Sequence, residues 1–308
     1  MNSDLAHPTR WLFTACLSCL LCVSSLAFLA SGAHAQDAAA LESRYSALRG
    51  QLASSPFKQP LVLESAQTSD TLKGNIYAVV RQPYSLVRQA LEGRNHWCDI
   101  LILHLNVKNC RALDSGSEKI LSVAIGRKFD QPIADAYPVD FIYRIAASGP
   151  GYLDVLLHAD KGPLDTKDYR IALEAIPLTA NTSFLHMSYA YAYGLAARIA
   201  VQAYLATLGR DKVGFSVVSH NPDGSPVYVG NVRGMLERNT MRYYLAIEVY
   251  LNTYTLPPGE QPEKRLEDWF SSVERYPRQL HELDRDEYLS MKRKELARQK
   301  TAVNTGEK

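Results

Sequence analysis

Charged and imidazole side chains gather on two neighbouring predicted strands. Asp154 and His158 share a face of the strand predicted over 152–159, because residues two or four apart along a strand point the same way. Asp168, Arg170 and Glu174 share a face of the strand predicted over 168–176. These groups could form an acid–base site or the polar floor of a cavity. The solvated outer face of an antiparallel sheet gives the same pattern, and we favour that interpretation.

An aromatic alternation over 183–193 is the most regular pattern in the chain. Tyr189, Tyr191 and Tyr193 alternate with alanine, while His186 falls on the opposite face. A period of two predicts a strand, and small residues opposite bulky ones predict that both faces are covered. Tyrosine combines an apolar ring with a polar hydroxyl, so it suits cavity walls as well as ordinary strands. We expect one face of this strand to line a cavity.

Several arginines lie along the helix predicted over 232–254. Arg233 and Glu237 are four residues apart and predict a modest ion pair. Arg238 and Arg242 have the same spacing but carry like charges, so they need a partner. Acidic residues of the sheet or the anionic headgroup of a ligand could serve. Pairing within the protein is the favoured alternative.

No common catalytic or metal motif is present. The chain contains no Gly-x-Ser-x-Gly, His-Glu-x-x-His or Gly-x-Gly-x-x-Gly sequence. His96 and His104 have no companion at metal-ligand spacing, and Cys16-Leu-Ser-Cys19-Leu-Leu-Cys22 lies inside an apolar leader. We therefore predict no catalytic residue, no cofactor and no metal. The net charge of +2 gives no ground for a nucleic-acid partner.

The elements that position these groups follow from the same periodicities. Helices are predicted over 41–52, from Pro83, over 95–105 with Asn95 as N-cap, and over 195–208, 232–254, 266–273 and 284–299. Strands are predicted over 60–64, 72–80, 119–127, 138–147, 152–159, 168–176 and 183–193, with a further short one over 212–218. This order predicts an α+β fold, an antiparallel meander closed by a helix.

The order of elements resembles the helix-grip fold of the START and SRPBCC superfamily. The stretches that carry the resemblance are Gly74-Asn-Ile-Tyr-Ala-Val-Val80, Gln82-Pro-Tyr-Ser-Leu-Val-Arg-Gln-Ala-Leu91, Asn95-His-Trp97 and the strand and helix over 183–208. The resemblance covers 61–209. It implies a curved sheet wrapped on a helix around a cavity for lipids, sterols or other apolar ligands, and it supplies no universal catalytic residue. The helices over 233–308 exceed what this fold needs, so the closing helix is either 195–208 or 232–254.

The N-terminus predicts export. A polar leader carries Arg10, an apolar run follows over 11–30, and small residues at Ala33 and Ala35 predict cleavage before Gln36. An uncleaved anchor is the alternative, since about 20 apolar residues can span a bilayer. We expect a periplasmic or secreted protein.

The two cysteines that remain after cleavage, Cys98 and Cys110, predict a disulfide in an exported chain. A disulfide requires Cα atoms roughly 4.4 to 6.8 Å apart, so the chain must fold back between them, near 106–109. Two free buried thiols are the alternative.

These patterns divide the chain into a signal peptide (1–35), an N-terminal helix and linker (36–59), an α+β domain (60–218), a helical extension (219–300) and a disordered tail (301–308). The leading hypothesis is an exported carrier of a lipid-like or other apolar molecule. The alternatives are an enzyme that uses the same cavity, and a component of an envelope complex that docks through the C-terminal helices. The candidate ligand-binding residues are Trp97, Tyr143, His158, Arg170, His186, Tyr189, Tyr191, Tyr193, Arg238 and Arg242.

Overall fold

The computed structural model describes residues 37–194, 199 and 212–305, with side chains described as far as residue 300. The predicted signal peptide lies outside the described residues, and so does the helix predicted over 195–208 except for Ile199.

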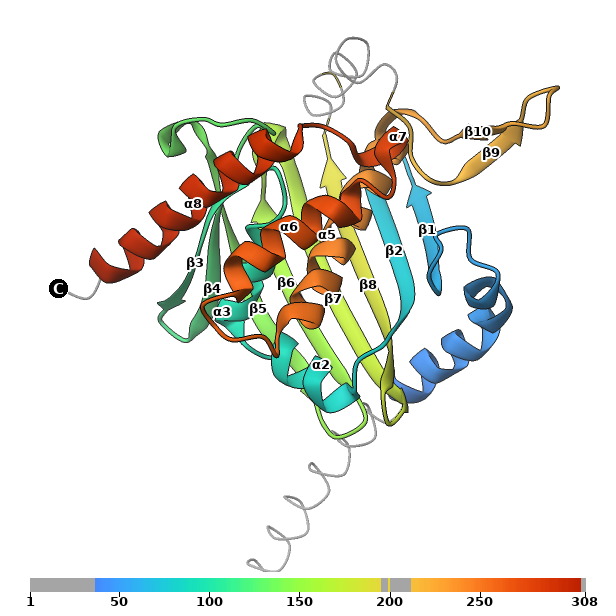
Figure 1. Ribbon diagram of the computed structural model, residues 1–308, viewed down its shortest axis with the longest axis horizontal. Helices are drawn as coiled ribbons and strands as arrows, with labels where there is room; N and C mark the ends of the chain where they lie inside the picture. Colours follow the sequence, from blue (N-terminus) through green and yellow to red (C-terminus); the bar gives the residue numbers. More distant parts are fainter. Residues whose placement is uncertain (1–36, 195–198, 200–211, 306–308) are drawn as a thin grey trace, which may run out of the picture.

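An eight-stranded antiparallel sheet forms the body of the protein (Figure 1). Its strands lie in the order β1-β2-β8-β7-β6-β5-β4-β3, so β3 to β8 form a meander and β2 pairs with the last strand of that meander. The predicted α+β class with an antiparallel meander is therefore confirmed. The strands are β1 (Leu61–Gln67), β2 (Thr71–Val80), β3 (Val107–Ser115), β4 (Glu118–Ile125), β5 (Tyr137–Ser148), β6 (Leu153–Lys161), β7 (Thr166–Thr179) and β8 (Thr182–Tyr193).

The long helix α5 (Asn231–Thr253) crosses the inner face of the sheet and contacts β1, β2 and β8 (Figure 1). It approaches β2 so closely that a Cβ atom on Gly74 would overlap Thr240 Oγ1. A glycine is therefore needed at this crossing. Of the two candidate closing helices, α5 is the one that the structure shows on the sheet.

A separate helix over 37–53 covers part of the outer face. Its buried leucines, Leu41, Leu48 and Leu52, pack against Val62 and Phe184 in a cluster distinct from the main core. Because alternate residues of β8 point to opposite faces, Phe184 faces this helix while the tyrosines face α5. Both faces of β8 are therefore covered, as its alternation predicts.

The C-terminal helices α6 (Gln261–Val273), α7 (Pro277–Leu280) and α8 (Arg285–Thr305) pack against this body. Trp269 of α6 stacks on Tyr288 of α8 with ring centres 5.0 Å apart. Helix α8 runs along the edge strand β3, where Gln299 Oε1 accepts a hydrogen bond from the Cys110 backbone N–H at 2.9 Å. Among the described residues, the exposed large apolar side chains lie on other elements. Up to residue 300, these helices therefore expose no large apolar side chain.

The predicted disulfide between Cys98 and Cys110 is confirmed, with a Cα–Cα distance of 5.1 Å. It links α3 (Arg94–Leu101), which follows α2 (Tyr84–Leu91), to β3. The chain reverses over 102–106, earlier than predicted, because β3 already begins at Val107. The prediction of Asn95 as N-cap was wrong: the helix starts one residue earlier, Gly93 precedes it, and no side chain caps it.

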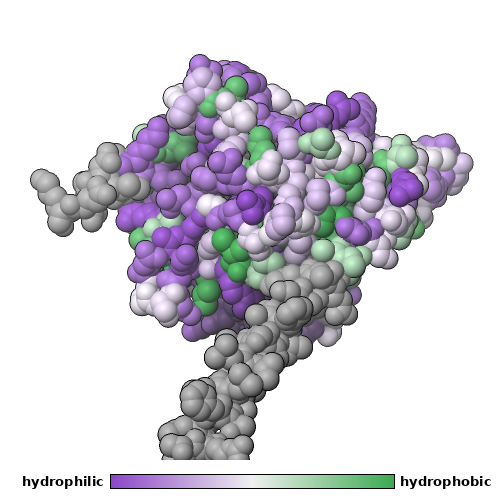
Figure 2. Space-filling view, turned by 90° about the horizontal axis from the view of Figure 1, so that it is seen from below, coloured by the Kyte–Doolittle hydropathy of each residue, from purple (hydrophilic) through white to green (hydrophobic). Residues whose placement is uncertain are grey.

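A hairpin of β9 (Val217–His220) and β10 (Pro226–Tyr228) projects from the body beside β1 (Figure 1). The short strand predicted over 212–218 thus begins later, at Val217. Viewed from below, the surface is mainly hydrophilic, and its hydrophobic areas are small and separate (Figure 2).

Candidate ligand-binding site

Four tyrosines meet between the inner face of the sheet and α5. Tyr189 and Tyr191 of β8 lie with ring centres 5.5 Å apart. Tyr169 of β7 stacks on Tyr191 at 5.1 Å, and Tyr243 of α5 packs on Tyr189 at 5.2 Å. Phe141 of β5 meets Tyr169 edge-on at 6.5 Å. The strand order and the crossing of α5 bring these rings together from four elements of the fold.

The hydroxyl groups of this cluster are only partly satisfied. Tyr169 shares a hydrogen bond with Thr166 Oγ1 at 2.8 Å. Within the described part of the chain, the hydroxyls of Tyr189, Tyr191 and Tyr243 have no hydrogen-bond partner. None of the three oxygen atoms is completely shielded from solvent. Buried tyrosine hydroxyls normally find a partner. These three hydroxyls are therefore available for a hydrogen bond to a ligand or to water.

Several residues on one face of α5, including Tyr243, are partly exposed. Tyr243 stays partly exposed although its ring packs on the buried Tyr189. Val232, Met235 and Asn239 are also partly exposed, and their spacing of three or four residues places them on the helix face of Tyr243. This face of α5 is therefore less densely packed than its neighbouring faces.

Burial raises the pKa of the hydroxyls of Tyr189, Tyr191 and Tyr243 well above that of a free tyrosine, and the neighbouring tyrosines add to the shift. The hydroxyls therefore stay protonated at neutral pH. They can donate a hydrogen bond to a ligand and accept one from it, but they do not supply a phenolate base.

His104 lies next to the aromatic cluster, and the cations Arg242 and Lys128 lie near His104. His104 stacks on Tyr243 with ring centres 4.6 Å apart, and its buried Nε2 has no hydrogen-bond partner. Arg242 pairs with Glu282 at 2.8 Å, as does Lys128 at 2.6 Å. The partner of Arg242 therefore comes from the segment before α8, whereas the sequence left the choice between the sheet and a ligand open. Arg238 donates to Val213 O at 3.2 Å.

Acid is expected to destabilise the protein through His104. Burial lowers its pKa well below 6.5, and the nearby Arg242, Lys292, Lys128 and Lys108 lower it further. Below pH 6.5, His104 binds a proton in the unfolded chain but not in the folded chain. The contribution of neutral His104 to stability is therefore fully present above pH 6.5 and is lost as the pH falls below that value. Urea unfolding at pH 7.5, 6 and 5 measures this loss.

The matched pair for this prediction is His104→Phe and His220→Phe. The first keeps a ring on Tyr243 and removes the titrating group, so the acid-induced loss should become shallower. His220 is exposed on the hairpin, and its replacement should leave the pH profile unchanged. Equal pH profiles for wild type and His104→Phe would contradict the assignment.

His186, His158 and Arg170 lie on the outer face of the sheet. His186 bonds Glu174 Oε2 through Nδ1 at 2.7 Å and Asn75 Oδ1 through Nε2 at 3.1 Å. His158 bonds Asp160 at 2.9 Å, and Arg170 is exposed. These side chains do not reach the tyrosine cluster. An acid–base group that converges into the interior is therefore not formed, because the inward residues are their neighbours on the strands.

The remaining sequence candidates have structural partners. Trp97 is fully buried and donates from Nε1 to Leu91 O at 2.9 Å. Tyr143 donates to Glu92 O at 2.6 Å. Tyr193 accepts from Gln67 Nε2 at 3.2 Å, at the end of the sheet. The structure thus brings Tyr189 and Tyr191 together, while the hydroxyl of Tyr193, next to Tyr191 on the same face, is engaged by Gln67.

Sequence reasoning missed two residues of the cluster, Tyr169 and Tyr243. Tyr169 alternates with the polar residues of β7, which is a usable signal. The place of Tyr243 opposite Tyr189 depends on how α5 crosses the sheet. Among the described residues, no three His, Cys, Asp or Glu side chains form a metal site. No described helix has the length and apolar character to cross a membrane.

No family model and no curated protein matches the chain. Solved structures with a similar arrangement include human StAR-related lipid transfer protein 5, with 8% identity over 72% of this chain and 98% of that one and a TM-score of 0.35. The human StarD13 (DLC2) lipid transfer and protein localization domain matches with 10% identity over 68% and 97%, at 0.30. Truncated norcoclaurine synthase from Thalictrum flavum matches with 12% identity over 47% and 91%, at 0.32. The chain itself has an α+β fold in which a long helix lies on an eight-stranded antiparallel sheet.

Proposed function

We propose that this protein binds an apolar small molecule, lipid-like in character and carrying at least one polar group, beside Tyr189, Tyr191 and Tyr243. The observation that carries the proposal is the set of three buried hydroxyls without a partner among the described residues. A ligand hydroxyl, carbonyl or amine would complete them, and the aromatic rings would cover its apolar part. A largely apolar site with a few placed polar groups is the usual design of a small-molecule site.

The chemistry of the site supports a carrier over an enzyme. Its tyrosines stay protonated at neutral pH, and the imidazole, carboxylate and guanidinium groups of β6 and β7 lie on the opposite face. We propose that the carrier works outside the cytoplasm. Its disulfide supports this, because such bonds persist in oxidising compartments. The apolar leader over 11–30 supports it as well.

Loss of the free hydroxyls should weaken ligand binding without unfolding the protein. Tyr189→Phe and Tyr191→Phe each remove one hydrogen-bonding group and keep the ring, so each is expected to weaken binding about three- to tenfold. The probe is N-phenyl-1-naphthylamine, an apolar fluorophore with one N–H, titrated with emission as readout. Tyr45→Phe is the control, since Tyr45 packs on Phe184 at the outer face of the sheet, opposite the cluster.

Native mass spectrometry of the protein purified from the compartment in which it accumulates completes the test. The expected result is a copurifying apolar molecule that the probe displaces. Absence of such a molecule, together with equal probe affinity in all variants, would reject the proposed function.

A further inference from the structure

Strand β1 is an edge of the sheet, and the outer hydrogen-bonding groups of its second half are open. Val79 N–H donates to Pro60 O at 3.0 Å, which fixes the alternation of the antiparallel pair. The backbone groups of Leu61, Leu63 and Ser65 therefore point away from β2. Ser55 Oγ donates a hydrogen bond to the outward Leu61 carbonyl at 2.6 Å. Within the described part of the chain, no group occupies the outward N–H and C=O of Leu63 and Ser65.

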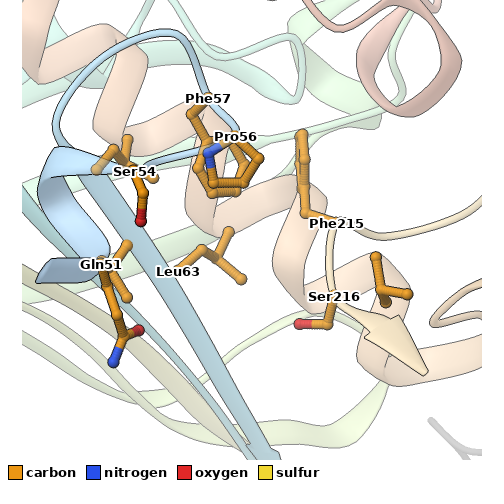
Figure 3. A pocket seen from close by; sticks show the side chains of 10 residues that line it. Gln51, Ser54, Pro56, Phe57, Leu63, Phe215 and Ser216 are labelled. Atoms are coloured by element: carbon orange, nitrogen blue, oxygen red, sulfur yellow. The ribbon is translucent and has the colours of Figure 1, made fainter. Parts of the chain in front are cut away.

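A pocket of about 330 Å³ lies against this open edge. Leu63 borders it from the strand, Phe57 from the preceding loop, and Phe215 from the segment that leads into β9 (Figure 3). Val217, the first residue of β9, also lines it. Val217 is 48% exposed, so its side chain is open to an incoming segment. An extended segment laid along β1 would thus place alternate side chains over an apolar pocket.

The far wall of the pocket is held in place by a buried carboxylate. Glu237 is fully buried and accepts from the backbone N–H groups of Phe215 at 2.6 Å and Ser216 at 2.9 Å. Its other oxygen accepts from Ser216 Oγ at 2.6 Å and from the hydroxyl of Ser65 on β1. Because one carboxylate ties both walls together, the pocket is preformed and an incoming segment meets a rigid edge.

Cations surround the same edge. Arg233 is 35% exposed and donates to Ser65 Oγ at 2.7 Å. Lys58 follows the pocket residue Phe57 and is exposed. Arg278 lies over Tyr228, the β10 partner of Val217, with its guanidinium 4.9 Å from the ring centre. No carboxylate in the described part of the chain forms an ion pair with Lys58 or Arg278. The surroundings therefore favour a partner that carries acidic side chains.

We propose that β1 receives an extended acidic–apolar peptide segment of a partner protein as an added strand. Such a segment matches all three features: its backbone completes the open edge, an apolar side chain enters the pocket, and a carboxylate meets the cations. This surface is distinct from the tyrosine site, so the peptide can bind here whether or not the proposed ligand binds there.

The test uses a phage-displayed library of random twelve-residue peptides selected against the purified chain. The expected enriched peptides alternate apolar residues and contain Asp or Glu. Ser65→Pro removes the outward N–H at an edge position where proline is tolerated, and should weaken the enriched peptide about tenfold or more. Ser65→Ala is the matched control because it removes the same hydroxyl, with its hydrogen bonds to Glu237 and Arg233, but keeps the outward N–H. Ser65→Pro should therefore bind the peptide about tenfold more weakly than Ser65→Ala. Circular dichroism and thermal melting establish that both variants are folded.

N-methylation of the enriched peptide keeps the test decisive even if Ser65→Pro fails to fold. Methyl groups on alternate amides should abolish binding in one register and leave the other register unaffected. Failure to enrich any peptide, equal loss in both Ser65 variants, or indifference to N-methylation would each overturn the proposal. Probe binding at the tyrosine cluster should be the same in all Ser65 variants, which separates this proposal from the ligand-binding function.

Discussion

Glu295→Gln is expected to lower the free energy of unfolding by about 3–5 kcal/mol, the cost of removing one partner from a buried ion pair. Glu295 is fully buried between Lys108, at 3.0 Å, and Lys292, at 2.7 Å. The other acceptors near Lys108 Nζ are the Leu105 and Phe129 carbonyls and Met291 Sδ, none of them charged. Burial lowers the pKa of both lysines, that of Lys292 to about 8. Without the carboxylate, two buried positive charges face each other. Urea unfolding followed by circular dichroism measures the effect.

The matched control is Glu263→Gln. Glu263 pairs with Arg293 where both side chains are about half exposed, and such a pair contributes about 0–1 kcal/mol. Adding Lys108→Met to Glu295→Gln should recover part of the lost stability, because it removes one uncompensated charge. A loss below about 1 kcal/mol for Glu295→Gln would mean that the two lysines do not depend on this carboxylate.

Joint replacement of Cys98 and Cys110 by alanine is expected to cost about 3 kcal/mol. The bond closes a short loop, with a sequence separation of 12, and ties α3 to β3. Both positions are buried, so alanine avoids placing a new polar group in the core. The measurement is chemical unfolding of the double variant beside oxidised and reduced wild type.

Reduced wild type should approach the stability of the double variant, since both lack the cross-link. A variant as stable as the oxidised protein would show that packing alone holds α3 against β3. Each single variant should lose the cross-link as well, and should match the double variant within about 1 kcal/mol.

Most strands of the sheet could be predicted because each carries its own alternation, as β8 does. Strand β3 was missed because its periodicity is obscured by Lys108, a fully buried lysine. Its charge is compensated by Glu295, 187 residues further along the chain. A local pattern cannot show a contact of this kind, so no element was predicted over 107–115.

The site could be predicted only in part. The alternation of β8 placed Tyr189 and Tyr191 on one face, but a period of two does not say which face points inward. The same limit applies to His158 and Arg170, which do share a face, the outer one. Tyr243 joins the cluster through the crossing of α5 over the sheet, a relation between distant segments. The unpartnered hydroxyls follow from that packing and have no counterpart in the sequence.

The two edges of the sheet differ in a way that sets how many partners it can take. At β3, Gln299 of α8 accepts a hydrogen bond from the Cys110 N–H at 2.9 Å, and α8 packs along the strand. At β1, the second half of the strand is open. Molecules whose sheets have two open edges can pair edge to edge into a filament. A molecule with one blocked edge can pair with one partner strand only. Strand addition here should stop after a single partner, so the open edge allows specific pairing while the helix on the opposite edge limits polymerisation.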